Sequence, residues 1–382
     1  WEEDVDSFKV NQLGLSYQGA FYFNTGRVNG FGYYGSAFFN ILGSVSWEII
    51  GENEPAAMND LITTVIGSMS VGEMFYRLYL EAYAAGVPGF LTFFINPVAS
   101  LHRLTGWKVP ESGRNIYELK YYTGGGFAYS DSSVPGEPQN NFSHRGPYVS
   151  AGTHIIYGNP FEQDSIIPYR HFELDTEVGL DMGNYMEFRI VSDGYLLSFS
   201  PVWTDKDSMS TGLSVHFDCI LLGQFGLDSS INQFSNAIDW TVKHQHLFSE
   251  DTTFQIKLHA GLTFLGSSNY YLNSWEAKGP YEPKNFGCGF NSKLFLNFEN
   301  KKFGRLEADI LFYTMWTFPG SARFSHGYVY WIFADLSYSH HITEKISLGI
   351  TNSFAIERGT FSGYSDTNIL NNAVKVFVAW NL

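Results

Sequence analysis

The stretch Thr252–Gly266, TTFQIKLHAGLTFLG, decides the fold because its side chains change character at every second position. The residues between the apolar positions are polar or small. Successive side chains of a β-strand point to opposite faces. The stretch therefore predicts a long strand with one polar and one apolar face, the apolar residues being Phe254, Ile256, Leu258, Ala260, Leu262 and Phe264.

A period of two continues from about Ile116 to the end of the chain. It marks about thirteen strand candidates, near residues 116–129, 146–157, 169–181, 184–192, 195–204, 210–222, 234–247, 252–265, 285–299, 303–316, 327–341, 344–357 and 372–382. Single-chain bacterial barrels have an even number of strands. Two alternatives follow: twelve strands if one candidate is false, or fourteen if a strand near residues 10–24 is added.

The connections and the strand ends indicate a membrane barrel. Short polar turns at 300–302 and 342–344 alternate with long loops predicted at 267–284, 318–326 and 359–371. Alternating short and long connections and aromatic girdles at the strand ends are typical of outer-membrane β-barrels, whereas soluble sandwiches have strands of about half this length. The aromatic residues taken for the girdles are Trp203, Trp240, Trp316, Trp331 and Trp380. The last strand, apolar at every second position up to Leu382, is similar to the closing strand that the barrel assembly machinery reads.

Composition excludes several classes of protein. Of 382 residues, 16% are charged and 18% aromatic, whereas soluble domains average about 25% charged residues. The net charge of −15 argues against a nucleic-acid partner. No phosphate-binding glycine loop, zinc motif or Gly-x-Ser-x-Gly elbow is present, so we expect no cofactor and no metal site. Cys219 and Cys288 should be free thiols that face lipid.

Two apolar helices, Phe31–Ile50 and Met58–Tyr83, precede the barrel and each carries one polar stripe. Glycine and proline in the segment between them predict a tight helical hairpin. We call its ionisable and amide residues the polar seam: Glu48, Glu52, Asn59, Asp60, Glu73 and Arg77. Such groups are costly against lipid, so the hairpin should lie in the lumen of the barrel or under it.

The polar seam has two interpretations. As a structural network, Glu73 and Arg77 would form an i,i+4 ion pair, and Asn59 or Asp60 would cap the turn. As a functional pocket, the clustered acids and Arg77 would bind a ligand or act in catalysis, because such clusters perturb pKa values. Histidines give less guidance: His259 should point into the lumen beside Lys257, and other histidine pairs at 244–246 and 340–341 should lie near strand ends.

Several motifs carry a resemblance to a known family. They are Tyr22–Gly30 (YFNTGRVNG), Trp47-Glu48 followed by Gly51-Glu52, Pro55 with Asn59–Ile62, Gly72-Glu73 with Tyr76–Leu78, and Asn96–Val98 with Arg103-Leu104. With them, residues 20–104 resemble a bacterial family catalogued as a domain of unknown function, the DUF3943 type. The resemblance implies an outer-membrane β-barrel and brings no agreed activity.

These observations predict three parts: an N-terminal segment 1–30 with a possible first strand, a helical hairpin region 31–110 and an outer-membrane barrel 111–382. The barrel would be non-enzymatic, acting as a plugged pore or as a structural or accessory subunit of an envelope assembly. The alternative is an enzyme that modifies envelope lipid or glycan with the acids and Arg77 of the polar seam. Expected partners are outer-membrane lipid, the barrel assembly machinery and other outer-membrane proteins.

Overall fold

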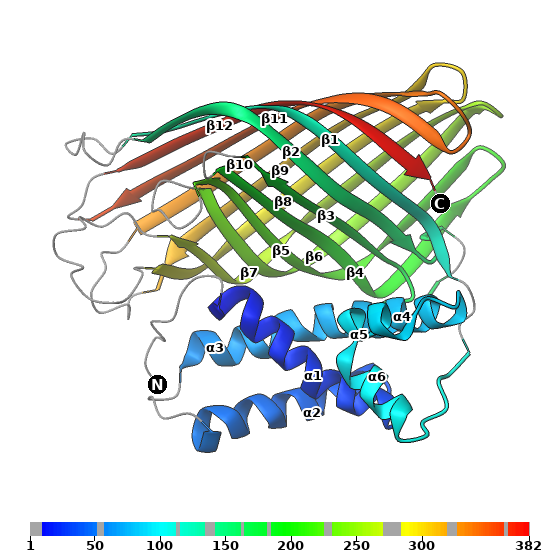
Figure 1. Ribbon diagram of the computed structural model, residues 1–382, viewed down its shortest axis with the longest axis vertical. Helices are drawn as coiled ribbons and strands as arrows, with labels where there is room; N and C mark the ends of the chain where they lie inside the picture. Colours follow the sequence, from blue (N-terminus) through cyan, green and yellow to red (C-terminus); the bar gives the residue numbers. More distant parts are fainter. Residues whose placement is uncertain are drawn as a thin grey trace. The chain divides into compact units, whose positions relative to one another are not determined.

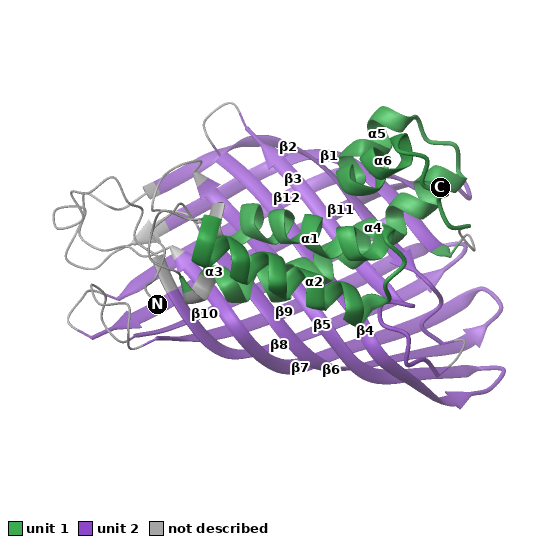
Figure 2. Cartoon of the chain, turned by 90° about the horizontal axis from the view of Figure 1, so that it is seen from below, with its two compact units in different colours: residues 1–116, 280–282 green, residues 117–279, 283–382 purple. Residues whose placement is uncertain are grey.

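The structure, a computed structural model, describes residues 10–51, 57–111, 115–133, 142–161, 164–181, 185–224, 231–269, 284–318, 327–362 and 366–381. The chain divides into a helical unit that ends at Ile116 and a barrel unit that begins at Tyr117, coloured green and purple in Figure 2. The barrel was predicted to begin at residue 111.

The barrel unit is a closed ring of twelve antiparallel strands (Figure 1), as the alternating sequence predicts. Each strand pairs with its neighbours in sequence, and β1 closes the ring by pairing with β12. The strands are β1 (Ile116–Ser133), β2 (Phe142–Tyr157), β3 (Phe172–Leu180), β4 (Tyr185–Trp203), β5 (Asp207–Gln224), β6 (Ile231–Ser249), β7 (Thr252–Asn269), β8 (Lys284–Asn300), β9 (Gly304–Thr317), β10 (Gly327–His341), β11 (Ile346–Phe361) and β12 (Thr367–Asn381).

The strand count of twelve confirms the alternative in which one candidate is false and excludes the fourteen-stranded one. The candidates 184–192 and 195–204 are one strand, β4, whose register shifts between Tyr195 and Leu197. Such an irregularity interrupts the alternation of side chains, which explains why one strand looks like two. The extra strand near residues 10–24 is wrong: residues 10–28 are helical, and the buried residues Ser16, Ala20 and Phe23 follow a helical spacing.

One predicted long loop is also wrong. β11 runs to Phe361 and β12 begins at Thr367, so residues 359–371 are mostly paired strand rather than loop. The polar composition of this stretch is misleading because strand pairing depends on backbone hydrogen bonds. Most of the other two predicted long loops, 270–283 and 319–326, lies outside the described residues.

The two faces of the barrel wall differ as the alternation predicts. On β7, Leu258 and Leu262 are exposed, whereas His259 is buried and Lys257 lines the lumen. Trp331 does not belong to the predicted girdle. The register of β10 places it two residues from Phe333 on the same inward face, and it is buried there. Cys288 is exposed as expected. Cys219 is buried, but it alternates with the lumen-facing Asp218 and Ile220 and so lies on the outward face, as predicted; both thiols are free.

The helical unit is built around α1 (Leu15–Val28), which packs against both α2 (Tyr33–Ser46) and α4 (Ser68–Ala84). The remaining helices are η1 (Val10–Gly14), η2 (Trp47–Gly51), α3 (Met58–Ile62), η3 (Thr63–Gly67), α5 (Gly89–Ile95) and α6 (Pro97–Leu104). None of the described helices combines the length and the apolar character that crossing a membrane needs.

Glycines set how closely these helices approach. A Cβ at Gly26 of α1 would collide with Ser36 of α2, and one at Gly19 would collide with Thr64 and Ser68. The predicted hairpin of two helices has a third helix, α1, packed against both of them. Because α2 and α4 touch each other less than each touches α1, the polar stripes pack largely against α1 rather than only against one another.

Candidate functional site

Glu73 is the centre of one half of the polar seam. Its side chain is fully buried and its Oε1 lies 2.8 Å from Arg77 Nε, at the i,i+4 spacing. Its Oε2 lies 2.9 Å from Nε of Arg27, a residue of α1 that sequence reasoning missed. Burial raises the pKa of Glu73, and the charges of Arg77 and Arg27 oppose that rise. The Arg27–Glu73 pair joins α1 to α4, whereas the Arg77–Glu73 pair lies within α4.

The other half of the seam has different partners. Glu48 is buried and its Oε2 accepts a hydrogen bond of 3.0 Å from the backbone N–H of Ala57. Asp60 is buried in the first turn of α3. Glu52 and the side chain of Asn59 lie outside the described residues. The bonds of Glu48 and Glu73 hold helices and turns together, which favours the structural interpretation of the seam.

The lumen of the barrel holds a second set of ionisable side chains, which we call the ionic layer. Lys243 of β6 lies 2.8 Å from Glu173 of β3 and 2.9 Å from Asp193 of β4. The other ion pairs of the layer are Lys257–Glu173, Lys375–Glu177, Arg189–Asp335 and Arg305–Glu118. Every one of these pairs joins strands that are not neighbours in the ring, so the side chains cross lumen space rather than lie along the wall.

Arg189 and Asp335 form the longest of these crossings. They lie on β4 and β10, which are six strands apart in a ring of twelve and therefore on opposite walls. Both side chains are mostly withdrawn from solvent, with 17% and 13% of their surface exposed, so removing one partner should be destabilising because the other charge stays in a low dielectric. The Arg189–Asp335 pair thus spans the lumen from one wall to the opposite wall.

An apolar cluster occupies the lumen near one end of the barrel. At this end β5 and β9 end and β6 and β10 begin, within residues 222–231 and 315–329. We call it the apolar layer, and its members are Val191, Ile220, Leu222, Ile231, Leu311, Tyr313, Met315, Val329, Trp331, Phe333, Ala355, Phe361 and Ile369. They come from β4, β5, β6 and β9 to β12. Trp331 is fixed there, because its Nε1–H donates a hydrogen bond of 2.8 Å to Glu357 Oε2.

Open space in the lumen is unequally distributed. A cavity of about 260 Å³ lies on the ionic side, lined by charged and polar side chains that include Lys120, His154 and Arg305. A second, smaller cavity of about 20 Å³ lies beside Arg189 and Phe333, where the two layers meet. That volume holds about one water molecule. Of these two cavities, the larger and more polar one thus lies on the ionic side.

Sequence reasoning identified part of this lumen. The alternation directs Lys257 inward, and by the same parity it directs Lys293 and Arg305 inward. The structure gives these three residues ion-pair partners in Glu173, Asp218 and Glu118. The acids were missed because parity does not tell which strands face each other across the ring. Only the strand order and register supply that information.

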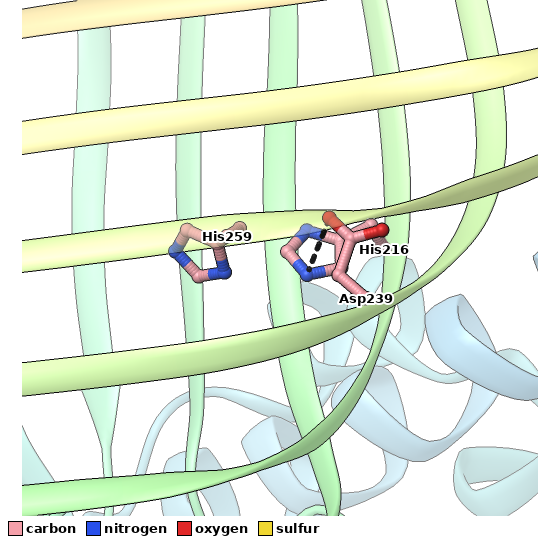
Figure 3. Close-up of side chains that lie close together, drawn as sticks. All are labelled: His216, Asp239 and His259. Carbon is pink, nitrogen blue, oxygen red and sulfur yellow. Dashed lines mark ion pairs between the residues drawn. The ribbon is translucent and has the colours of Figure 1, made fainter.

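The histidines have several roles. His244 and His246 both approach Asp207 Oδ1, at 3.2 and 2.7 Å. His259 Nδ1 lies 2.8 Å from the hydroxyl oxygen Oγ1 of Thr241. His216, Asp239 and His259 form a buried group whose ligand atoms all lie within 4.8 Å of one another (Figure 3), and among the described residues this group could hold a metal ion.

The fold and site define a closed twelve-stranded antiparallel β-barrel with an N-terminal helical segment. Residues 1–98 match a family described as a domain of unknown function, DUF3943, the type that the sequence resembles. No curated protein matches the chain.

Solved barrels superpose loosely on this chain. The NanC porin has a TM-score of 0.31 at 9% identity, covering 67% of this chain and 100% of that one. The toluene transporter TodX of Pseudomonas putida has a TM-score of 0.26 at 8% identity, covering 69% and 89%. The KdgM porin in complex with disordered oligogalacturonate has a TM-score of 0.25 at 10% identity, covering 67% and 98%.

Proposed function

We propose that this protein is a non-enzymatic integral β-barrel of a bacterial outer membrane, whose lumen is closed by its own side chains. Membrane residence is supported by the outer face of the wall, where large apolar side chains such as Leu262, Phe290 and Ile310 are about half exposed. An apolar patch of that extent marks a surface that contacts lipid or protein. Outer-membrane lipid is then its immediate partner, and the barrel assembly machinery and other outer-membrane proteins are its expected protein partners.

The observation that carries the proposal is that side chains of opposite walls meet inside the lumen. The ionic layer crosses it through Arg189 and Asp335, and the apolar layer follows. A cavity of only about 20 Å³ lies beside Arg189 and Phe333, where the two layers meet. Ions and sugars carry hydration shells far larger than one water, so such a lumen would not pass them. The protein would act as a closed pore or as a structural or accessory subunit of an envelope assembly.

The alternative of a lipid- or glycan-modifying enzyme depends on the polar seam. Glu73 is engaged by two arginines and Glu48 by the backbone of Ala57. A general acid or base needs a free path to the proton of its substrate, so these bonds favour a structural role. The helical plug of the lumen stays a prediction.

Permeability of proteoliposomes tests the closure. Liposomes that contain the wild-type chain should swell in isosmotic sugar no faster than empty ones. A variant with Arg189→Ala and Trp331→Ala removes one member of each layer and should admit the sugar. Trp203→Ala, on an exposed aromatic of the same barrel, is the matched control and should stay closed. Wild-type swelling at the rate of an open porin would refute the proposal.

A further inference from the structure

We infer that His216, Asp239 and His259 form a binding site for a divalent transition-metal ion on the inner face of the barrel wall. The three residues come from the adjacent strands β5, β6 and β7 (Figure 3). The register places Asp239 opposite Ser214 and opposite Gly261, hence two residues from His216 on one side and from His259 on the other. Diagonal neighbours of this kind are close enough for long side chains to meet.

The donor atoms are buried and two of them have no hydrogen bond. The relative exposures of His216, Asp239 and His259 are 1%, 0% and 0%. Within the described part of the chain, His259 Nε2 and Asp239 Oδ2 find no hydrogen-bond partner, although Asp239 Oδ2 lies 3.4 Å from His216 Nε2. Buried polar atoms are nearly always satisfied. A cation bound between the three side chains would satisfy both atoms at once.

Neighbouring residues hold the ligands in place. Thr241 Oγ1 lies 2.8 Å from His259 Nδ1 and occupies that nitrogen, which leaves Nε2 facing the site. Asn291 Nδ2 donates a hydrogen bond of 2.9 Å to Asp239 Oδ1 and leaves Oδ2 free. A Cβ at residue 261 would collide with the Asp239 side chain, so Gly261 provides the room in which the carboxylate lies. Hydrogen bonds of this kind orient metal ligands in known sites.

One cation already lies beside the site. Lys293 Nζ is 2.8 Å from His216 Nδ1 and also forms an ion pair with Asp218. Ligation through His216 Nε2 puts the imidazole proton on Nδ1, so Lys293 must give up its bond to His216 and keep the one to Asp218. The Lys293–Asp218 pair has no net charge, and Asp239 supplies the negative charge that favours a metal ion.

The donor set indicates the class of metal. Two imidazole nitrogens and one carboxylate oxygen suit Zn²⁺ and its neighbours in the first transition row rather than Mg²⁺ or Ca²⁺. Because all three ligands are buried, the ion would link three strands rather than meet a substrate. No spacing in the sequence predicts this site, since strand pairing brings together residues that are far apart in the chain.

Metal titration of the full chain, refolded in detergent and stripped with a chelator, tests the site. Wild type should bind one Co²⁺ per chain with a visible ligand-field absorption band, and Zn²⁺ should displace the Co²⁺ and raise the unfolding temperature. His259→Gln should lose the band and the shift. His244→Gln, a histidine of β6 that contacts Asp207 instead, is the matched control and should keep both.

A positioning variant separates a built site from chance contacts. Thr241→Val removes the hydroxyl beside His259 and should weaken Zn²⁺ binding about 10- to 100-fold, the usual effect of losing a group that orients a ligand. The inference is overturned if wild type shows no absorption band, or if it binds Zn²⁺ no better than His259→Gln. Should His259→Gln fail to fold, the wild-type Co²⁺ spectrum alone decides.

Discussion

The ion pairs of Glu73 allow a quantitative prediction for the helical unit. Changing both Arg27 and Arg77 to alanine leaves a fully buried carboxylate without its cations. The unpaired carboxylate of Glu73 can become neutral by binding a proton. Each pH unit above the usual pKa of 4.5 adds about 1.36 kcal/mol to the cost of that protonation, so the cost at pH 7 is about 3 kcal/mol. This agrees with the roughly 3–5 kcal/mol measured when buried pairs are broken.

A single change should cost less. Arg27→Ala leaves Arg77 at 2.8 Å from Glu73, so one charged hydrogen bond is lost, at about 1.5–3 kcal/mol. Hydrogen exchange of the amides in α1 and α4 measures these values locally. The double variant should lose roughly 100-fold in protection at pH 7, the equivalent of about 3 kcal/mol at about 1.4 kcal/mol per factor of ten. Lys108→Ala, at an exposed position of the same unit, is the control.

The stability lost in the double variant should depend on pH in a definite direction. In the double variant the folded-state pKa of Glu73 is raised above its unfolded value. The penalty is therefore absent below pH 4.5 and grows as the pH rises above it. The difference between wild type and double variant should shrink to under about 1 kcal/mol at pH 4.5. The reasoning fails if the double variant loses no more protection than Lys108→Ala, or if its loss is the same at both pH values.

Three further predictions concern the barrel. If the end with the short turns faces the periplasm, Lys302→Cys should escape an impermeant maleimide on intact cells while Ser362→Cys, at the other end, reacts; the reverse pattern contradicts this orientation. Because Cys288 is exposed and Cys219 buried, a small maleimide should label one thiol per folded chain and two after denaturation, and two before denaturation would exclude the described burial. Trp331→Ala removes a buried side chain of the apolar layer and its bond to Glu357, so it should destabilise the barrel by about 3–5 kcal/mol and lower its heat-modifiability temperature, whereas an equal effect of Trp203→Ala would show that burial is not the cause.

The sequence predicts the barrel well because one property, alternation, repeats in every strand. Thr252–Gly266 alone shows the period, and β7 covers this stretch. Alternation fails at bulges, which is why β4 was read as two strands. Alternation also does not identify strand segments that are rich in polar side chains, such as those within residues 359–371.

The site was harder to predict than the fold. Parity directs Lys257 and His259 inward, but the partners of these side chains, Glu173 and Thr241, follow only from the ring order and register. Arg27 was missed for a similar reason. It lies on a helix that was read as a strand candidate, and its distance in sequence from Glu73 gives no hint of the 2.9 Å contact.

The most direct test of the central claim is the electrical conductance of the wild-type chain in a planar lipid bilayer. A lumen crossed by Arg189–Asp335 and filled by the apolar layer predicts a baseline no different from that of lipid alone, at either polarity. Insertion must be shown independently, by protease protection of the same preparation. Regular conductance steps of uniform size from wild type would contradict the account, since they require a continuous water-filled path through both layers.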